Sequence, residues 1–159
     1  MTWLLVTLVV LLACDLAVRV YYVRIVLRVF ETKPPFSVHP FPPDPRAESL
    51  EFQSSDGITL RGSLYRQSEG TAKGLILFCP ETDGSHWSAM SYCHALMEDG
   101  FDVMSFDFRG QGESDPLPGY VPNHWPTMYE VEDVRAAVDY ISHREDLQGL
   151  PLGVMGVSR

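Results

Sequence analysis

The sequence contains few cysteines and few basic residues. Its three cysteines, Cys14, Cys79 and Cys93, form an odd number without close spacing, which argues against a disulfide framework and against a cysteine-based zinc site. The 12 Lys and Arg residues are outnumbered by 21 Asp and Glu residues, which leaves a formal net charge of −9. Nucleic-acid binding needs a basic surface, so this composition argues against a nucleic-acid partner.

The sequence also contains no visible internal repeat. Hydrophobic residues make up 45% of its 159 residues, which is enough to bury a core and argues against global disorder. This length suits one domain with an appendage. Four of the 12 basic residues lie within residues 1–33, so the negative charge is concentrated in the rest of the chain.

The longest apolar run lies at the N-terminus. From Thr2 to Val18 the chain reads "TWLLVTLVVLLACDLAV", in which Asp15 is the one charged residue. A helix of this length would span roughly 25 Å, close to the minimum for a bilayer core. We therefore predict an N-terminal transmembrane and interfacial helix over residues 1–33 that crosses the membrane once.

Basic and aromatic residues follow the apolar run. Arg19, Arg24 and Arg28 are interleaved with two tyrosines, a pattern typical of a membrane interface. We expect residues 18–30 to continue as a helix lying at the membrane surface. The positive-inside rule then places the rest of the chain in the cytoplasm.

Three other interpretations of the apolar run stay open. A cleaved signal peptide is one, although the run lacks a basic start. A lipoprotein signal is another, because "LLAC" places Cys14 after a small residue. A buried core helix is the third, although so uniformly apolar a helix is not expected before a proline-rich segment.

That proline-rich segment covers residues 34–47 and holds six of the 12 prolines. Such a composition does not form a helix and predicts an extended, semi-rigid linker. The linker separates the N-terminal helix from a body that covers residues 48–159.

The body alternates between strand and helix patterns. The segment "SLEFQSSDGITLRGSLYR" predicts two strands joined by an Asp-Gly turn. "GLILFCP", "DVMSFDF" and "PLGVMGV" are short apolar runs typical of strands buried on both faces. Strands that alternate with helices predict right-handed crossovers and a parallel sheet, hence an α/β fold.

Two helices are expected between these buried strands. Ser88 can cap the first helix, and Gly100 ends it. Thr127 and Glu130 have the spacing of a capping box at the start of the second helix. The apolar stripe of the second helix comprises Val131, Val134, Val138 and Ile141.

The last residues contain four fifths of a catalytic motif. Gly156-Val157-Ser158-Arg159 matches G-x-S-x-G without its final glycine. In that motif the serine occupies a sharp turn between a strand and a helix, and the small neighbours permit the strained backbone. The alternative is an ordinary glycine-serine loop after a strand.

A second motif, "SFDFRGQGESD", follows the strand pattern at its start. Gly110 and Gly112 predict a tight turn there. A dinucleotide-binding loop is the competing interpretation, but the third glycine of G-x-G-x-x-G is missing and no helix follows at once. Asp107 and Arg109 are expected to form an ion pair that braces the loop.

The order of elements and these two motifs together resemble the α/β-hydrolase family. The resemblance runs from about Glu48 to Arg159 and includes the pattern D-x-R-G-x-G-x-S from Asp107 to Ser114. It implies an eight-stranded, mostly parallel sheet, of which this chain would hold the N-terminal part. It also implies a serine nucleophile followed in the chain by an acid and a histidine. No metal and no cofactor are implied.

Carried onto this sequence, the resemblance assigns the nucleophile to Ser158. It assigns the backbone N–H groups of Thr82 and Arg159 to the oxyanion hole. Members of the family often carry His-Gly at the start of the Thr82 loop. This chain carries Pro80-Glu81 instead, which removes the freedom of the glycine and adds a negative charge.

All five histidines precede Ser158, so none can take the place of the family's triad histidine. The acid expected after the serine is also absent. We therefore expect that the sequence is truncated and that the 159-residue chain is inactive alone. His86 and His124 lie beside tryptophans in expected loops, where they could line a substrate mouth or be ordinary surface histidines.

The sequence thus predicts a membrane-anchored serine hydrolase that acts on an ester, thioester or amide by acyl transfer through Ser158. Its expected partners are a small-molecule or lipid-like acyl substrate and the membrane. The alternative is a non-catalytic, membrane-tethered module that uses a hydrolase-like scaffold for binding.

Overall fold

A computed structural model describes residues 2–32, 38–67, 70–123 and 126–158. The chain divides into two compact units, Met1–Lys33 and Pro34–Arg159.

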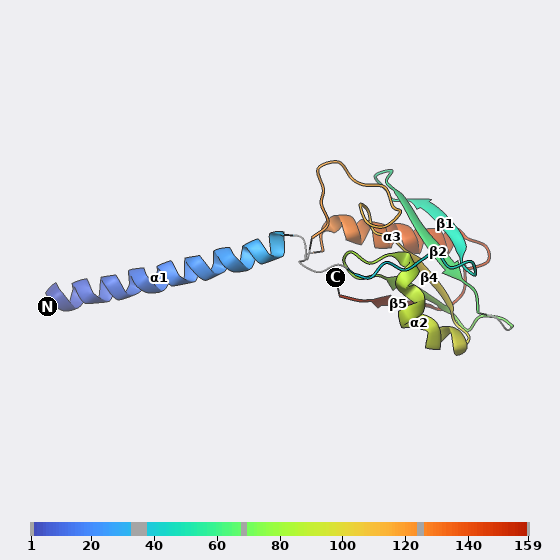
Figure 1. Cartoon of the computed structure of the whole chain (residues 1–159), viewed down its shortest axis with the longest axis horizontal. Coiled ribbons are helices and arrows are strands. Elements are labelled where there is room, and N and C mark those ends of the chain that lie inside the picture. Colours follow the sequence, from blue (N-terminus) through green and yellow to red (C-terminus); the bar gives the residue numbers. More distant parts are fainter. Residues whose placement is uncertain (1, 33–37, 68–69, 124–125, 159) are drawn as a thin grey trace. The chain divides into compact units, whose positions relative to one another are not determined.

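The first unit is a single helix, α1 (Thr2–Glu31), in which no side chain is buried. Asp15 and Arg19 form an ion pair along it, with 2.7 Å between Arg19 Nε and Asp15 Oδ2. The helix continues without a break through residues 18–30 (Figure 1). The expected helix over residues 18–30 is therefore confirmed, and its position at a membrane surface stays a prediction.

The second unit contains a mixed sheet of five strands in the order β1-β2-β4-β3-β5 (Figure 1). The first two strands form an antiparallel hairpin, and β2 also pairs antiparallel with β4. The next three strands in the sheet, β4, β3 and β5, run parallel. Their bounds are β1 Glu48–Gln53, β2 Thr59–Tyr65, β3 Leu75–Cys79, β4 Asp102–Phe106 and β5 Leu152–Gly156.

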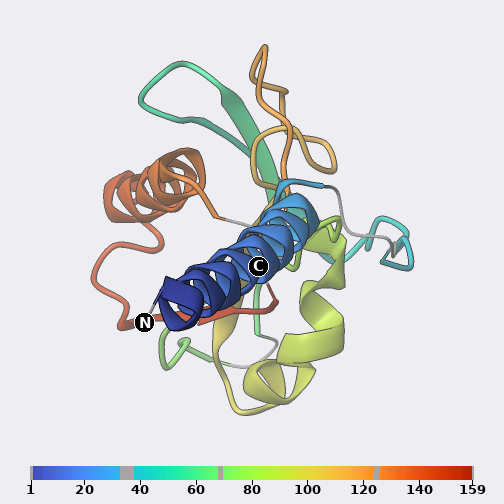
Figure 2. The same ribbon diagram turned by 90° about the vertical axis from the view of Figure 1, so that its left-hand side faces the viewer.

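Helices cover both faces of this sheet. Helix α2 (Ala89–Glu98) and α3 (Met128–His143) lie on opposite sides of the strands (Figure 2). Neighbouring residues of one strand pack on opposite faces of the sheet, because side chains alternate along a strand. Leu77 belongs to the cluster that includes Ile141 of α3, whereas Phe78 belongs to the cluster that includes Cys93 of α2.

The Asp-Gly turn between β1 and β2 is confirmed. Gly57 has a φ of +84°, and its N–H donates to the Ser54 carbonyl at 2.9 Å. The Ser54 N–H in turn donates to the Ile58 carbonyl at 2.9 Å. A positive φ at the second turn residue costs glycine little, which explains the turn's position.

The two helix starts differ from each other. At α3 the capping box is confirmed, because the Thr127 side chain accepts from the first turn and Glu130 accepts from the Thr127 N–H. At α2 the expected Ser88 cap is wrong, since its side chain makes no capping hydrogen bond. A short 3-10 turn, η1 (His86–Ser88), runs directly into α2 and gives Ser88 a helical backbone.

Two expected burials are also corrected. Val131 is 40% exposed, whereas Ile141 is buried and Val134 and Val138 pack against the core, as expected. Ala136 and Ala137 also belong to the buried face of α3. The strand β5 was expected to be buried on both faces, but it forms the sheet edge among the described residues, and Val154 is 61% exposed. Its apolar composition is that of an interior strand, which explains the expectation.

Candidate active site

Three loops meet at the carboxyl edge of the parallel strands. They follow β3, β4 and β5, which are neighbours in the sheet and point the same way. Parallel neighbours bring the residues that follow each strand to one edge, where α/β proteins place their ligand sites. The three segments contain Thr82, Asp107 and Ser158 respectively.

Ser158 lies directly after β5 in a backbone conformation that non-glycine residues rarely adopt. Its φ is +36°, and the residue is exposed. The preceding Val157 N–H donates to the Cys79 carbonyl at 3.2 Å, which ties this turn to the end of β3. A strained backbone at a serine after a strand is the feature that the G-x-S-x-G motif requires.

Thr82 lies beside Ser158. The Thr82 N–H donates to the Ser158 carbonyl at 3.3 Å, so the loop after β3 touches the turn after β5. The fold thus brings together two of the three residues that the sequence assigned to the site. The third, Arg159, lies outside the described residues.

Glu81 occupies the position where related proteins often carry glycine. The residue is only 8% exposed, and Tyr92 Oη donates to its Oε1 at 3.2 Å. Its buried Oε2 has no hydrogen-bond partner within the described part of the chain. Partial burial raises the pKa of the Tyr92 hydroxyl, and the charge of Glu81 raises it further. A buried carboxylate therefore lies next to the Thr82 N–H in the chain.

Asp107 and His86 form a buried pair that the sequence did not predict. The side chains are 0% and 1% exposed, and His86 Nδ1 lies 2.9 Å from Asp107 Oδ2. The His86 N–H also donates to Asp107 Oδ1 at 2.6 Å. His86 is therefore neither a surface histidine nor an open wall of a substrate mouth. His124, the other histidine named for that role, lies outside the described residues.

The glycine-rich segment after β4 folds around Asp107. The Glu113 N–H donates to Asp107 Oδ2 at 2.7 Å, and Ser114 Oγ donates to the Asp107 carbonyl at 2.6 Å. Gly112 has a φ of +47°, and a Cβ there would overlap the Asp107 carboxylate. Glycine at this position therefore serves both the backbone conformation and the close approach of the acid.

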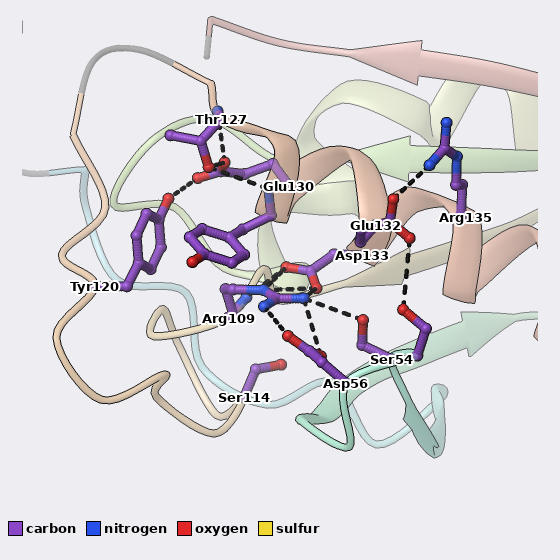
Figure 3. Close-up of polar contacts among 12 residues, drawn as sticks. Ser54, Asp56, Arg109, Ser114, Tyr120, Thr127, Glu130, Glu132, Asp133 and Arg135 are labelled. Atoms are coloured by element: carbon purple, nitrogen blue, oxygen red, sulfur yellow. Dashed lines mark hydrogen bonds and ion pairs between the residues drawn. The ribbon is translucent and has the colours of Figure 1, made fainter.

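Arg109 does not pair with Asp107, so the expected ion pair is wrong. The Arg109 side chain is fully buried, and it bonds Asp133 of α3 and Asp56 of the β1–β2 turn (Figure 3). Its NH1 lies 2.6 Å from Asp56 Oδ2, and its NH2 lies 2.6 Å from Asp133 Oδ1. Burial opposes the charge of Arg109, but these hydrogen bonds raise its pKa above the ordinary value. Arg109 thus joins the glycine-rich loop to the helix rather than to the site.

A signal for the His86–Asp107 pair was present in the sequence. The two residues follow two buried strands, β3 and β4, which pair in parallel. Their carboxyl ends therefore share an edge, and a histidine and an acid after them can meet there. The sequence alone does not show whether Arg109 pairs with Asp107 or with Asp133. No three His, Cys, Asp or Glu side chains within the described ranges group as a metal site.

The family model for "Serine aminopeptidase, S33" matches residues 69–159. The chain therefore belongs to this family of α/β hydrolases, and its family and fold support a hydrolase of the α/β type. The α/β-hydrolase resemblance predicted from the motifs is confirmed.

Similarity to individual proteins covers more of the chain than the family model does. YfhR of Escherichia coli K12 is 32% identical over 123 residues, which cover 73% of this chain and 40% of YfhR. A Pyrococcus furiosus esterase, Pf2001, has a TM-score of 0.60 at 21% identity over 78% of this chain and 46% of its own. An α/β serine hydrolase homologue from Coxiella burnetii has a TM-score of 0.57 at 22% identity, covering 69% of this chain and 50% of its own. The chain thus spans half or less of the lengths of these relatives.

Proposed function

We propose that this chain is part of a membrane-anchored serine hydrolase in which Ser158 is the nucleophile of acyl transfer. The observation that carries the proposal is the meeting of the Thr82 loop with the strained turn at Ser158. A nucleophile and an oxyanion donor must lie within a few ångströms of one reacting carbonyl. Membership of a hydrolase family supports the same chemistry.

In this proposal Ser158 Oγ attacks the substrate carbonyl carbon, and the alcohol, thiol or amine portion leaves with a proton. Water then releases the acid and restores the serine. The developing oxyanion takes N–H donors from Thr82 and Arg159. The Thr82 N–H, now bonded to the Ser158 carbonyl at 3.3 Å, would turn from that oxygen to the oxyanion. A general base takes the proton of the Ser158 hydroxyl and passes it to the leaving group.

We further propose that α1 crosses the membrane once. The helix is long and apolar enough to do so by length and composition. Thirty residues of helix rise about 45 Å, which matches a bilayer including its headgroup regions. Arg24 and Arg28 near its C-terminal end favour a cytoplasmic body by the positive-inside rule. Protease digestion of sealed vesicles tests this orientation; a body cleaved only from the non-cytoplasmic side would contradict it.

An ester, thioester or amide of a small or lipid-like acyl group is the substrate class that this chemistry accepts. The membrane helix favours a lipid-like ester, because such a substrate is concentrated where the body is tethered. The second candidate function is a non-catalytic, membrane-tethered binding module. The buried Glu81 favours it, because a negative charge beside the donor loop opposes an oxyanion.

A fluorophosphonate probe distinguishes the two functions. The protein is expressed from its complete coding sequence, and labelling is compared among wild type, Ser158→Ala and Ser91→Ala. Ser91 is an exposed serine of α2 and is the matched control. The hydrolase is expected to label in the wild type and in Ser91→Ala but not in Ser158→Ala. A folded wild type that does not label supports the binding module instead.

A further inference from the structure

The loop that carries Thr82 is held at both of its ends. At one end it continues from β3, which pairs with both β4 and β5. At the other end His86 bonds Asp107 through its main-chain N–H and its ring. Inside the loop, the one described hydrogen bond to the turn at Ser158 is that of the Thr82 N–H, at 3.3 Å. Thr82 thus lies between two held points, the end of β3 and His86, and its neighbour Glu81 also accepts from Tyr92 Oη at 3.2 Å.

The anchor itself is held from several directions. The Asp107 N–H donates to the Arg61 carbonyl of β2 at 2.8 Å, and the carboxylate accepts from the Glu113 N–H at 2.7 Å. Asp107 is therefore fixed by the sheet and by the glycine-rich segment before His86 reaches it. Hydrogen bonds to a charged acceptor are the stronger kind, and burial keeps water from competing for them.

The two ring nitrogens of His86 have different surroundings. Nδ1 faces the Asp107 carboxylate, whereas the buried Nε2 has no hydrogen-bond partner in the described ranges. A proton on Nδ1 is required for a hydrogen bond to a carboxylate, so the ring acts as a donor at that atom. The geometry therefore gives the ring a holding role through Nδ1 and assigns no role to Nε2.

We propose that the buried His86–Asp107 pair is a positioning pair that sets the place of the Thr82 N–H beside Ser158. This inference rests on the proposed hydrolase function. Neither residue touches the reacting atoms in it. Displacing a donor by about 1 Å is enough to slow a reaction about a hundredfold. Losing an oxyanion donor lowers the rate by a similar factor or more.

Three substitutions test the pair, and a fourth serves as the control. His86→Asn keeps an N–H near the place of Nδ1, whereas His86→Phe keeps a ring of similar shape but no donor. Asp107→Asn replaces one accepting oxygen by a donor group. Glu113→Ala is the control, because it keeps the main-chain N–H that bonds Asp107 and removes only the exposed side-chain hydrogen bond from Trp87 Nε1 to Glu113 Oε1, at 2.9 Å.

The first readout is hydrolysis of p-nitrophenyl butyrate by the protein expressed from its complete coding sequence. We expect kcat to fall at least 30-fold, about 2 kcal/mol of barrier, in His86→Phe and Asp107→Asn, with KM changed less than threefold. His86→Asn should recover at least a third of the wild-type kcat, and Glu113→Ala should stay within twofold. The double variant His86→Phe/Asp107→Asn should lose no more than the worse single variant, because the two residues act as a unit.

The second readout is hydrogen exchange of a peptide that covers residues 80–88. It is expected to exchange faster in His86→Phe and Asp107→Asn than in wild type, while peptides from α3 keep their protection. Unchanged exchange together with unchanged kcat overturns the proposal, and so does an equal loss of kcat in Glu113→Ala. Variants that lose α3 protection as well have unfolded, and His86→Asn then decides: if it folds and loses kcat like His86→Phe, the Nδ1 donor is not the cause.

Failure of the hydrolase proposal is distinguishable from failure of this one. If the wild type neither hydrolyses the ester nor labels with fluorophosphonate, the hydrolase proposal is contradicted. The exchange experiment still reports whether the pair holds the loop. If the wild type reacts and the variants react equally fast, only the proposed positioning role of His86 and Asp107 is contradicted.

Discussion

At the scale of single residues, the site depends on close packing around Asp107. Gly112 approaches the carboxylate so closely that any Cβ would overlap it, and its φ of +47° disfavours side chains independently. The acid cannot move aside without releasing His86 and the Glu113 N–H. One added methyl group therefore disturbs the centre of the site.

We predict that Gly112→Ala destabilises the body by about 3 kcal/mol or more, because it adds steric overlap to backbone strain. Gly119→Ala is the control, since Gly119 has a φ of +79° but open space around a Cβ. The control should lose about 1 kcal/mol from strain alone. Denaturant unfolding measures both free energies; equal losses in the two variants would show that overlap with Asp107 contributes nothing.

Cys93 offers a test of burial by pH. It is a fully buried residue of α2, and burial raises the pKa of its thiol from 9.0 to about 11. The folded state favours the neutral thiol, so the stabilisation from Cys93 is complete below pH 9 and decreases as the pH rises toward 11. We expect iodoacetamide to modify Cys93 at pH 8 only on unfolding, because its thiol is buried in the folded chain. Mass spectrometry of digested samples identifies the modified residue, and rapid modification of native Cys93 would contradict its burial.

At the scale of elements, the capping box fixes where α3 begins. The Thr127 N–H donates to Glu130 Oε2 at 2.7 Å, and Thr127 Oγ1 accepts from the Tyr129 N–H at 3.2 Å. This start also sets the position of Asp133, which holds the buried Arg109. Helix α3 thereby holds the glycine-rich segment in place through the bond between Asp133 and Arg109.

Thr127→Ala is predicted to lower the free energy of unfolding by about 1 kcal/mol, because it leaves first-turn N–H groups without the side-chain acceptor. Ser142→Ala near the other end of α3 removes an exposed hydrogen bond to the Asp139 carbonyl and should change stability by less than about 0.5 kcal/mol. Urea unfolding of both variants provides the comparison. A control that loses as much as Thr127→Ala would argue against a special role for the cap.

At the scale of the whole molecule, the chain combines an apolar helix with an α/β body. No residue of α1 is buried, so the helix unit leaves its apolar side chains exposed. Exposing this much apolar surface to water is unfavourable, and a bilayer removes the cost. The body, in contrast, has its own core on both faces of the sheet.

We predict that the chain co-floats with phosphatidylcholine vesicles and that a variant lacking residues 1–33 does not. A milder variant, Val10→Lys, should weaken vesicle association, because a charge near the middle of a spanning helix costs about 3 kcal/mol. Exposed Arg135→Lys in α3 is the control and should float like the wild type. Flotation of the shortened body to the same extent would assign membrane binding to the body instead.

Much of this architecture could be predicted from local sequence patterns. The Asp56-Gly57 turn and the capping box at Thr127 each involve residues a few positions apart, so nearby residue types suffice to specify them. The Ser88 cap failed for a local reason too, because the 3-10 turn before α2 gave Ser88 a helical backbone. The exposure of β5 could not be read from its apolar residues, since burial of a strand depends on what packs beside it.

The sequence by itself determined the apolar helix, the order of strands and helices, and the place of Ser158 after the last strand. Periodicity and turn chemistry act over a few residues, which makes them readable without coordinates. Only the tertiary structure decided that Asp107 holds His86, 21 residues away, and that Arg109 holds Asp133, 24 residues away. Such partners are chosen by strand order and crossover, because these bring distant residues to one edge of the sheet.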